Sequence, residues 1–216
     1  MSDLRTLFDK NRVWAEANKE RDPDFFRDLA REQNPTYLWI GCADSRVPAE
    51  SLVGAKAGEL FVHRNVANQV EPSDINCLSV LQFGVDVLKI EHVIVCGHYG
   101  CGGVRAAMGE KPLGIIDAWL ARIREVVRLH HEELEALSDH DARFRRLCEL
   151  NVLEQAVSAC HTPSVQAAWS AGQQLTVHGL IYDLERGLLE DVGFSVSAPS
   201  DIEAAYERTL AALTRS

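Results

Sequence analysis

Short apolar runs alternate with longer segments of helical periodicity from residue 35 to the C-terminus. The runs are rich in β-branched and aromatic residues, as in Tyr37-Leu38-Trp39-Ile40, and such residues favour strands. Strands that alternate with helices imply right-handed crossovers and a parallel sheet. The pattern therefore predicts an α/β fold with a central, mostly parallel sheet flanked by helices. The predicted strands are residues 36–41, 59–63, 91–96, 175–182 and 188–195, the last two joined as a C-terminal hairpin.

The segments between the strands carry apolar residues three and four positions apart. Residues 74–88 are the clearest case, because Leu78, Leu81, Val85 and Leu88 form one stripe of the kind that a helix buries. A polar stretch at residues 138–141 is expected to be a mobile loop. The predicted helices of this region are residues 48–53, 74–88, 115–136, 142–160, 163–171 and 200–214.

Residues 1–34 precede the first predicted strand and are expected to form an N-terminal helical arm within a single domain spanning residues 1–216. Helices are predicted at residues 3–20 and 23–33. The first carries a loose apolar stripe formed by Phe8, Val13, Trp14 and Ala17. This stripe packs either on a partner subunit or on the chain's own domain, and the sequence leaves both open.

The composition fits a soluble globular protein, with 46% hydrophobic and 25% charged residues in a chain of 216. A formal net charge of -10 argues against nucleic acid or an anionic membrane as partner. The chain shows neither a signal peptide nor an apolar run of membrane-spanning length. We therefore expect a cytoplasmic location, with the cysteines mostly as thiols. Those with apolar neighbours are expected in the core, namely Cys77, Cys96, Cys148 and Cys160.

Two polar segments, residues 41–46 and the glycine-rich residues 96–103, follow predicted strands. Because the carboxyl ends of parallel strands meet at one edge of a sheet, Cys42, His98 and Cys101 could converge there on one metal ion. Zinc accepts Cys and His, and three protein ligands leave a fourth position for water or substrate. The sequence therefore predicts a catalytic zinc site.

Other kinds of cysteine site fit less well. A structural zinc would need a fourth Cys or His at short spacing, and a thioredoxin-like redox site would need Cys-x-x-Cys. Two thiolates also bring the charge of a zinc site near zero, so its water should be less acidic than the value of about 7 for a His-only site. Activity is expected to favour alkaline pH and to fall below about pH 8.

Asp44 and Arg46 leave the first predicted strand beside the metal, close enough to pair. The guanidinium would keep Asp44 ionised and orient it to accept a hydrogen bond from hydroxide on zinc. Without that pairing, Asp44 is itself a good fourth zinc ligand, which defines an alternative closed state.

Residues 39–48, 61–68 and 96–103 resemble the corresponding segments of bacterial β-carbonic anhydrases, and the similarity extends from about Leu4 to Glu190. The resemblance implies one Zn2+ per chain on Cys42, His98 and Cys101. It also implies a catalytic Asp44–Arg46 dyad. The reaction implied is the reversible hydration of CO2 to bicarbonate and a proton.

The resemblance further implies a substrate pocket and an oligomer, either a homodimer or a homotetramer. Val66 and Gly102 would lie beside the metal, while Gln33, Phe61 and Phe83 would reach in across a dimer interface. Gln33 would donate a hydrogen bond to CO2 or bicarbonate. Position 83 is Tyr in some members, so the phenol hydroxyl is missing here. Plain core packing is the alternative for the two Phe residues.

A narrower resemblance concerns Trp39, Arg64 and Tyr182. They match residues that, in an allosteric subgroup of the family, hold an inhibitory bicarbonate away from the metal, so that Asp44 leaves Arg46 and moves onto zinc. Arg64 supplies charge, and the indole N–H and phenol hydroxyl are donors suited to an oxyanion. The alternative is that the two aromatics belong to the strand core and Arg64 is a surface charge.

Two other functions compete with CO2 hydration. One is hydrolysis of COS or CS2 on the same scaffold. The other is a non-catalytic zinc- or anion-binding module, against which Asp44 and Arg46 argue because a mere metal holder has no need of such a pair. Among the remaining histidines, His130, His131 and His140 are expected to be exposed, and none stands out as a proton shuttle.

Overall fold

The computed structural model describes residues 3–215, and the chain divides into two compact units, residues 1–34 and 35–216. The first unit contains α1 (Leu4–Arg21) and α2 (Phe25–Leu29). Trp14 meets Phe25 and Phe26 edge-on, with ring centroids 6.4 and 5.6 Å apart, which joins the two helices. The predicted helix 23–33 is shorter than expected, because the residues after Ala30 are polar and exposed and bury no stripe.

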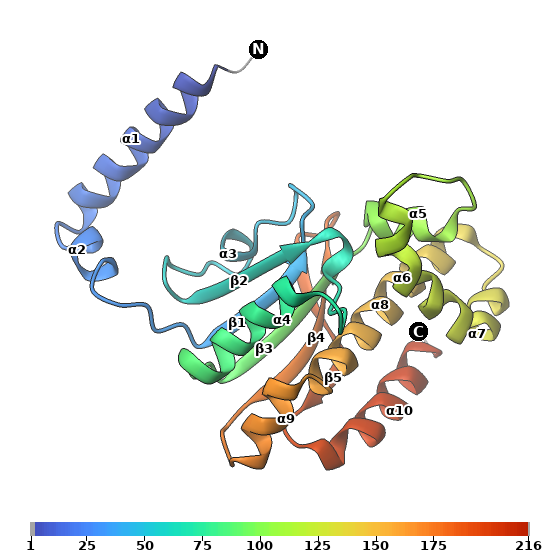
Figure 1. The fold of residues 1–216 in the computed structure, drawn as a ribbon. Helices are drawn as coiled ribbons and strands as arrows, with labels where there is room; N and C mark the ends of the chain where they lie inside the picture. Colours follow the sequence, from blue (N-terminus) through green and yellow to red (C-terminus); the bar gives the residue numbers. More distant parts are fainter. Residues whose placement is uncertain (1–2, 216) are drawn as a thin grey trace. The chain divides into compact units, whose positions relative to one another are not determined.

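The second unit is built on a five-stranded sheet in the order β2-β1-β3-β4-β5. Every neighbouring pair is parallel except β4 with β5, which is the predicted hairpin. The expected fold class is confirmed, as Figure 1 shows. The strands are β1 (Tyr37–Cys42), β2 (Leu60–Asn65), β3 (His92–His98), β4 (Thr176–Asp183) and β5 (Leu188–Val196).

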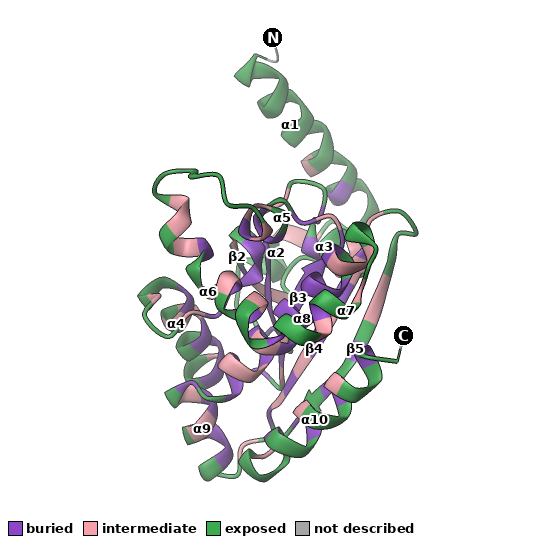
Figure 2. Cartoon of the chain, turned by 90° about the vertical axis from the view of Figure 1, so that its right-hand side faces the viewer, coloured by how far each residue is buried: buried purple, intermediate pink, exposed green. Residues whose placement is uncertain are grey.

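Most helices of this unit cover one face of the sheet and form the main core with it. Buried positions run through the strands and along the inner sides of α9 and α10, whereas α1 is largely exposed (Figure 2). The opposite face carries a smaller cluster, centred on Trp39, Ala49 and Cys96. The helices are α3 (Ala49–Leu52), α4 (Ile75–Gln82), α5 (Gly102–Met108), α6 (Ile116–Leu129), α7 (His131–Ala136), α8 (His140–Cys160), α9 (Pro163–Ser170) and α10 (Ile202–Leu213). No helix among residues 3–215 is long and apolar enough to cross a membrane.

Several helices differ from the prediction at their ends. The expected helix 74–88 is α-helical only to Gln82 and then forms a wider turn (Phe83–Val87), in which the Leu88 N–H donates to the Phe83 oxygen at 3.0 Å. Only the first half of the expected loop at residues 138–141 is non-helical, since α8 already starts at His140. Asp139 caps that helix by accepting from the Ala142 N–H at 2.8 Å.

The expected helix 115–136 breaks at His130, which is only 6% exposed rather than solvent-facing. Its imidazole hydrogen-bonds Glu154 of α8 at 2.8 Å. His130 is therefore buried against α8, and the expectation that it would be exposed was wrong.

Close approach of β3 to α8 depends on a glycine. A Cβ built on Gly97 would lie 2.5 Å from Cγ2 of Val152, so no larger residue fits without movement of the helix. This contact seats α8 directly behind the strand that carries His98.

Candidate metal centre

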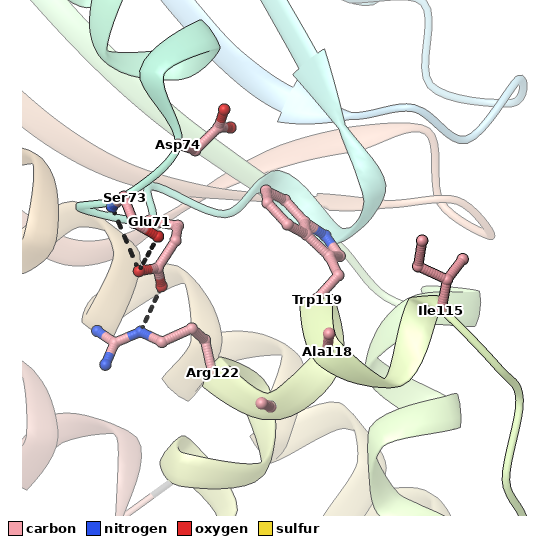
Figure 3. Close-up of a pocket in the computed structure, with 8 residues that line it drawn as sticks. Glu71, Ser73, Asp74, Ile115, Ala118, Trp119 and Arg122 are labelled. Carbon is pink, nitrogen blue, oxygen red and sulfur yellow. Dashed lines mark hydrogen bonds and ion pairs between the residues drawn. The ribbon is translucent and has the colours of Figure 1, made fainter.

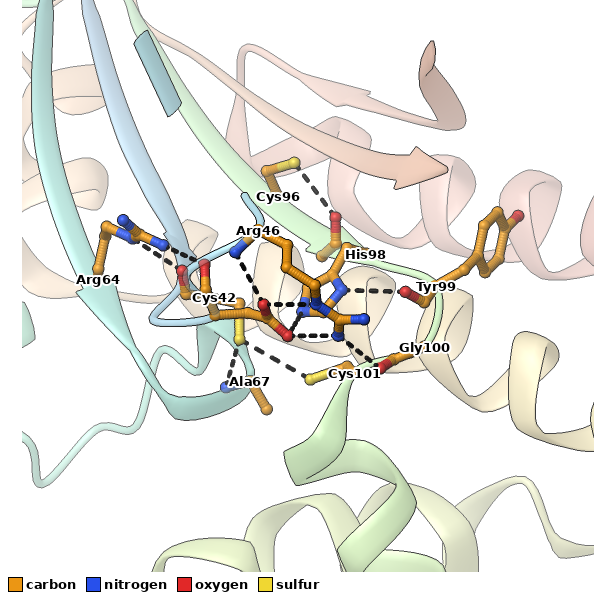
Figure 4. A network of polar contacts seen from close by, with 11 residues as sticks. Cys42, Arg46, Arg64, Ala67, Cys96, His98, Tyr99, Gly100 and Cys101 are labelled. Atoms are coloured by element: carbon orange, nitrogen blue, oxygen red, sulfur yellow. Dashed lines mark hydrogen bonds and ion pairs between the residues drawn. The ribbon is translucent and has the colours of Figure 1, made fainter. Parts of the chain in front are cut away.

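The three predicted zinc ligands converge at the carboxyl edge of the sheet (Figure 4). Cys42 ends β1, His98 ends β3, and Cys101 immediately precedes α5. Their ligand atoms lie within 4.8 Å of one another, and the two sulfurs are 3.8 Å apart. All three side chains are buried. This arrangement allows a single ion to contact all three.

The imidazole of His98 presents a lone pair to the two sulfurs. Its Nδ1 lies 3.0 Å from the Tyr99 backbone oxygen, which can only accept, so Nδ1 carries the proton. Nε2 is then unprotonated, and it is buried without a hydrogen-bond partner among the described residues. A buried acceptor of this kind is costly unless something binds it. Together with two cysteine sulfurs, it fits a zinc ion.

The two cysteines have opposite tendencies to ionise. The Cys101 thiol donates to the sulfur of Cys42 and lowers the pKa of Cys42 to about 4, against the opposing effect of burial. Hydrogen bonding from the backbone of Asp44 and Ala67 adds to that lowering. The same contact with Cys42, followed by burial, raises the pKa of Cys101. The pair therefore holds one negative charge by itself, and a bound cation would favour the second thiolate.

The other cysteines belong to the core, as predicted. Cys77, Cys96, Cys148 and Cys160 are at most 2% exposed. Burial raises the pKa of all four thiols, to about 12 for Cys77, Cys148 and Cys160. They stay neutral and unreactive at physiological pH.

Asp44 and Arg46 form the predicted pair next to the ligands. Arg46 donates from Nε to Oδ1 at 2.9 Å and from Nη2 to Oδ2 at 2.7 Å, and its backbone N–H also donates to Oδ1 at 3.0 Å. These bonds hold the pKa of the Asp44 carboxyl well below its usual range. Oδ2 lies 3.8 Å from Nε2 of His98. The structure therefore shows the open arrangement, with the carboxylate beside the ligand set and bound to Arg46.

Arg64 has a role that the sequence did not indicate. It donates from Nε to the Cys42 carbonyl at 2.8 Å and from Nη2 to the Asp44 carbonyl at 2.6 Å. Arg64 is thus not a free surface charge, because it holds the backbone of the segment that carries the dyad. These partners are carbonyl groups, which leave no signal in a sequence.

Trp39, Arg64 and Tyr182 lie on the same face of the sheet, as the strand register requires. Trp39 is 1% exposed and belongs to the small cluster on that face, against which Tyr182 packs. The Trp39 indole nitrogen would be 2.4 Å from a Cβ on Gly41, so only glycine fits beside it. Core packing thus explains part of the placement of Trp39 and Tyr182. Their binding of an anion stays a prediction.

The predicted pocket residues occur in three places. Val66 follows β2 and is 36% exposed, and Gly102 opens α5 with open space where its side chain would be. Phe61 and Phe83 contact each other, with ring centroids 5.8 Å apart, and Phe83 is 42% exposed. Gln33 lies in the first unit and is exposed. Their joint role in a pocket between subunits stays a prediction.

A second group of metal-ligating types comprises His63, Asp74 and Cys77, whose ligand atoms also lie within 4.8 Å of one another. Asp74 caps α4 by accepting from the Asn76 N–H at 3.0 Å, and the Cys77 thiol donates to the Gln69 carbonyl at 3.9 Å. These contacts explain the group without a metal.

A family profile described as carbonic anhydrase matches residues 37–189, which include the whole candidate centre. The chain belongs to the β-carbonic anhydrase family. It is therefore an enzyme of the lyase class that interconverts CO2 and bicarbonate.

Individual relatives agree with this assignment. A carbonic anhydrase of Emericella nidulans is 46% identical over 204 residues, covering 94% of this chain and 90% of the relative. The structure of Coccomyxa β-carbonic anhydrase in complex with acetazolamide superposes with a TM-score of 0.90 at 40% identity, covering 94% and 92% of the two chains. A tetrameric β-carbonic anhydrase of the ascomycete Sordaria macrospora gives 0.86 at 36% identity, covering 89% and 98%.

These relatives correct one sequence-based expectation. The motifs suggested bacterial β-carbonic anhydrases, whereas fungal proteins share up to 46% identity with the chain. The motifs surround the metal, where bacterial and fungal members have the same chemistry to perform, so they identify the family and not the lineage.

Metal content tests the ligand set. Cys101→Ser should lower bound zinc well below one ion per chain, because a neutral hydroxyl replaces a thiolate ligand. Cys77→Ser is a matched control, since that cysteine is equally buried and also lies beside a His and an Asp. Elemental analysis of both variants should show loss of zinc only in Cys101→Ser. Full zinc in Cys101→Ser would remove Cys101 from the ligands.

Proposed function

We propose that this carbonic anhydrase hydrates CO2 at one Zn2+ held by Cys42, His98 and Cys101. The observation that carries the proposal is the buried Nε2 of His98, which has no hydrogen-bond partner among residues 3–215. The ligand atoms of His98 and of the two cysteines lie within 4.8 Å of one another. Zinc held there would supply a Lewis acid that makes water a better nucleophile at alkaline pH. A non-catalytic zinc or anion module is disfavoured because the family to which the chain belongs is one of enzymes.

The Asp44–Arg46 pair would direct a hydrogen bond at the site. Oδ1 of Asp44 already accepts two hydrogen bonds, from the backbone and side chain of Arg46. Oδ2 accepts one and faces His98, so it retains a free lone pair toward the ligands. Because Arg46 holds the pKa of Asp44 low, the carboxylate accepts a hydrogen bond without taking up the proton. The carboxylate would thereby orient the water or hydroxide that attacks CO2.

The dyad is tested by Asp44→Asn. The amide cannot accept from Arg46 at both of its ends, so the pair should break while the ligands remain. We expect zinc to be retained and CO2 hydration to fall by about 10- to 100-fold at every pH from 7 to 9, as measured by stopped flow.

Asp117→Asn is the matched control, because Asp117 also pairs with an arginine, at 2.6 Å from Nη2 of Arg124. It should keep the full rate. Wild-type turnover in Asp44→Asn would rule out a role for the dyad.

We further propose that bicarbonate inhibits the enzyme by binding at Trp39, Arg64 and Tyr182. Support comes from the hydrogen bond between Nη2 of Arg64 and the Asp44 carbonyl. An anion that drew Nη2 away would release the backbone at Asp44 and weaken its pairing with Arg46. The binding energy of the anion would then favour the closed state, in which Asp44 is a zinc ligand.

Tyr182→Phe tests this inhibition, since it removes one donor and keeps the ring. The bicarbonate concentration that halves the rate at pH 7.5 should rise about tenfold, the effect of losing one hydrogen bond to a charged group. Tyr37→Phe is the control, because Tyr37 lies on the same face of β1 but stacks on His92. Arg64 variants are unsuitable because they also release the Cys42 carbonyl. Equal inhibition in Tyr182→Phe and wild type would reject the site.

We also propose that the active enzyme is a homodimer or homotetramer. The related Sordaria macrospora enzyme is described as tetrameric. Large apolar side chains on α1 are exposed, including Phe8 at 61%, Val13 at 66% and Trp14 at 50%. An interface between subunits would bury them. Sedimentation velocity at assay concentration should show no monomer, and a fully active monomer would contradict this proposal.

A further inference from the structure

The segment that follows β2 has an unusual backbone. Ala67 has φ 65° and ψ 33°, and Asn68 has φ 48°, so two successive residues other than glycine are left-handed. Both are buried, at 0% and 1% exposure. Such conformations persist only where surrounding contacts enforce them.

Side chains from two helices enforce this one. On one side, the Trp119 indole of α6 donates from Nε1 to the Val66 carbonyl at 2.8 Å. On the other, Asn151 of α8 donates from Nδ2 to the Ala67 carbonyl at 3.1 Å. Figure 3 shows Trp119 on α6, beside the segment that follows β2.

Trp119 is itself held in place by the same segment. Gln69 donates from Nε2 to the Trp119 backbone oxygen at 3.1 Å. Asn65 fixes Gln69 in turn, accepting from its N–H at 2.8 Å and donating to its carbonyl at 2.7 Å. The hydrogen bonds therefore run in both directions between α6 and the segment.

The peptide unit between Val66 and Ala67 connects Trp119 to the metal centre. This peptide is trans, so its carbonyl and its N–H point in opposite directions. The carbonyl accepts from Trp119, and the N–H of Ala67 donates to Sγ of Cys42 at 3.4 Å. A donor on the carbonyl also polarises the amide and strengthens its N–H as a donor.

We propose that Trp119 is a positioning residue for the metal centre, whose indole N–H aims the Ala67 amide at the Cys42 sulfur. The inference rests on the proposed zinc site and adds a residue that does not touch it. A hydrogen bond to a thiolate stabilises its lone pairs and reduces the electron density that it donates to a metal. Trp119 would thereby adjust the electronic character of one ligand from outside the ligand set.

The test uses Co2+-substituted protein, in which a thiolate-to-cobalt charge-transfer band reports the energy of the sulfur lone pairs. Trp119→Phe keeps an aromatic ring but lacks the N–H. If the Ala67 N–H then no longer points at the Cys42 sulfur, the lone pairs of that sulfur rise in energy. The band then moves to longer wavelength. A merely structural role would not move this band.

Trp169→Phe is the matched control. Trp169 of α9 also donates its indole N–H to a backbone oxygen, that of Leu175, at 2.7 Å. The control should be destabilised in urea unfolding but should keep the wild-type band. An unshifted band in Trp119→Phe, or an equal shift in both variants, would overturn the inference.

A second variant and the wild-type spectrum complete the test. If Trp119→Phe does not fold, Trp119→3-benzothienylalanine replaces the N–H by sulfur with almost no change of shape, and the same shift is expected. Absence of a thiolate band in wild-type protein would overturn the proposed metal site and the inference with it. A normal wild-type band that Trp119 variants leave unchanged would overturn the inference alone.

Discussion

The parallel pairing of β1 with β3 is the constraint on which the rest of the site depends. The two strands run side by side in register, so Cys42 and His98 emerge at the same edge of the sheet. An antiparallel pairing would separate them by the length of a strand. Cys101 then needs only the tight turn at Gly100, whose φ of 73° suits glycine. Strand topology and one turn therefore assemble the ligand set.

The centre combines a buried part with a solvent-facing part. Cys42, His98 and Cys101 are each at most 5% exposed, so their charges and lone pairs interact in a medium of low dielectric constant. The side chains of Asp44 and Arg46 are 17% and 58% exposed. Electrostatic attraction weakens in contact with water, so water screens the Asp44–Arg46 pair more than it screens the buried ligands.

The sequence was informative where chemistry is carried by rare side chains at strand ends. Cys42 and His98 were identifiable because few other roles suit such residues in that position. The hydrogen bonds of Arg64 could not be predicted because its partners are backbone carbonyls, and only the paired strands bring them near. Nothing in the residue type of Ala67 indicates a left-handed backbone, since alanine rarely adopts one. The burial of His130 could not be predicted, because its partner comes from a different helix. Sequence patterns report local preference, whereas these features arise from tertiary contacts.

Cys42 is held at two points by groups that respond to different influences. Arg64 binds its carbonyl and also that of Asp44, so whatever competes for the guanidinium acts on the dyad through the backbone. The Ala67 amide binds its sulfur and is controlled from the opposite side by α6. As proposed, the first connection would change the partner of Asp44, and the second would change how strongly one sulfur donates to the metal. The inhibition that we propose at Arg64 would therefore leave the hydrogen bond to the Cys42 sulfur in place, because that bond comes from Ala67 and does not involve Arg64.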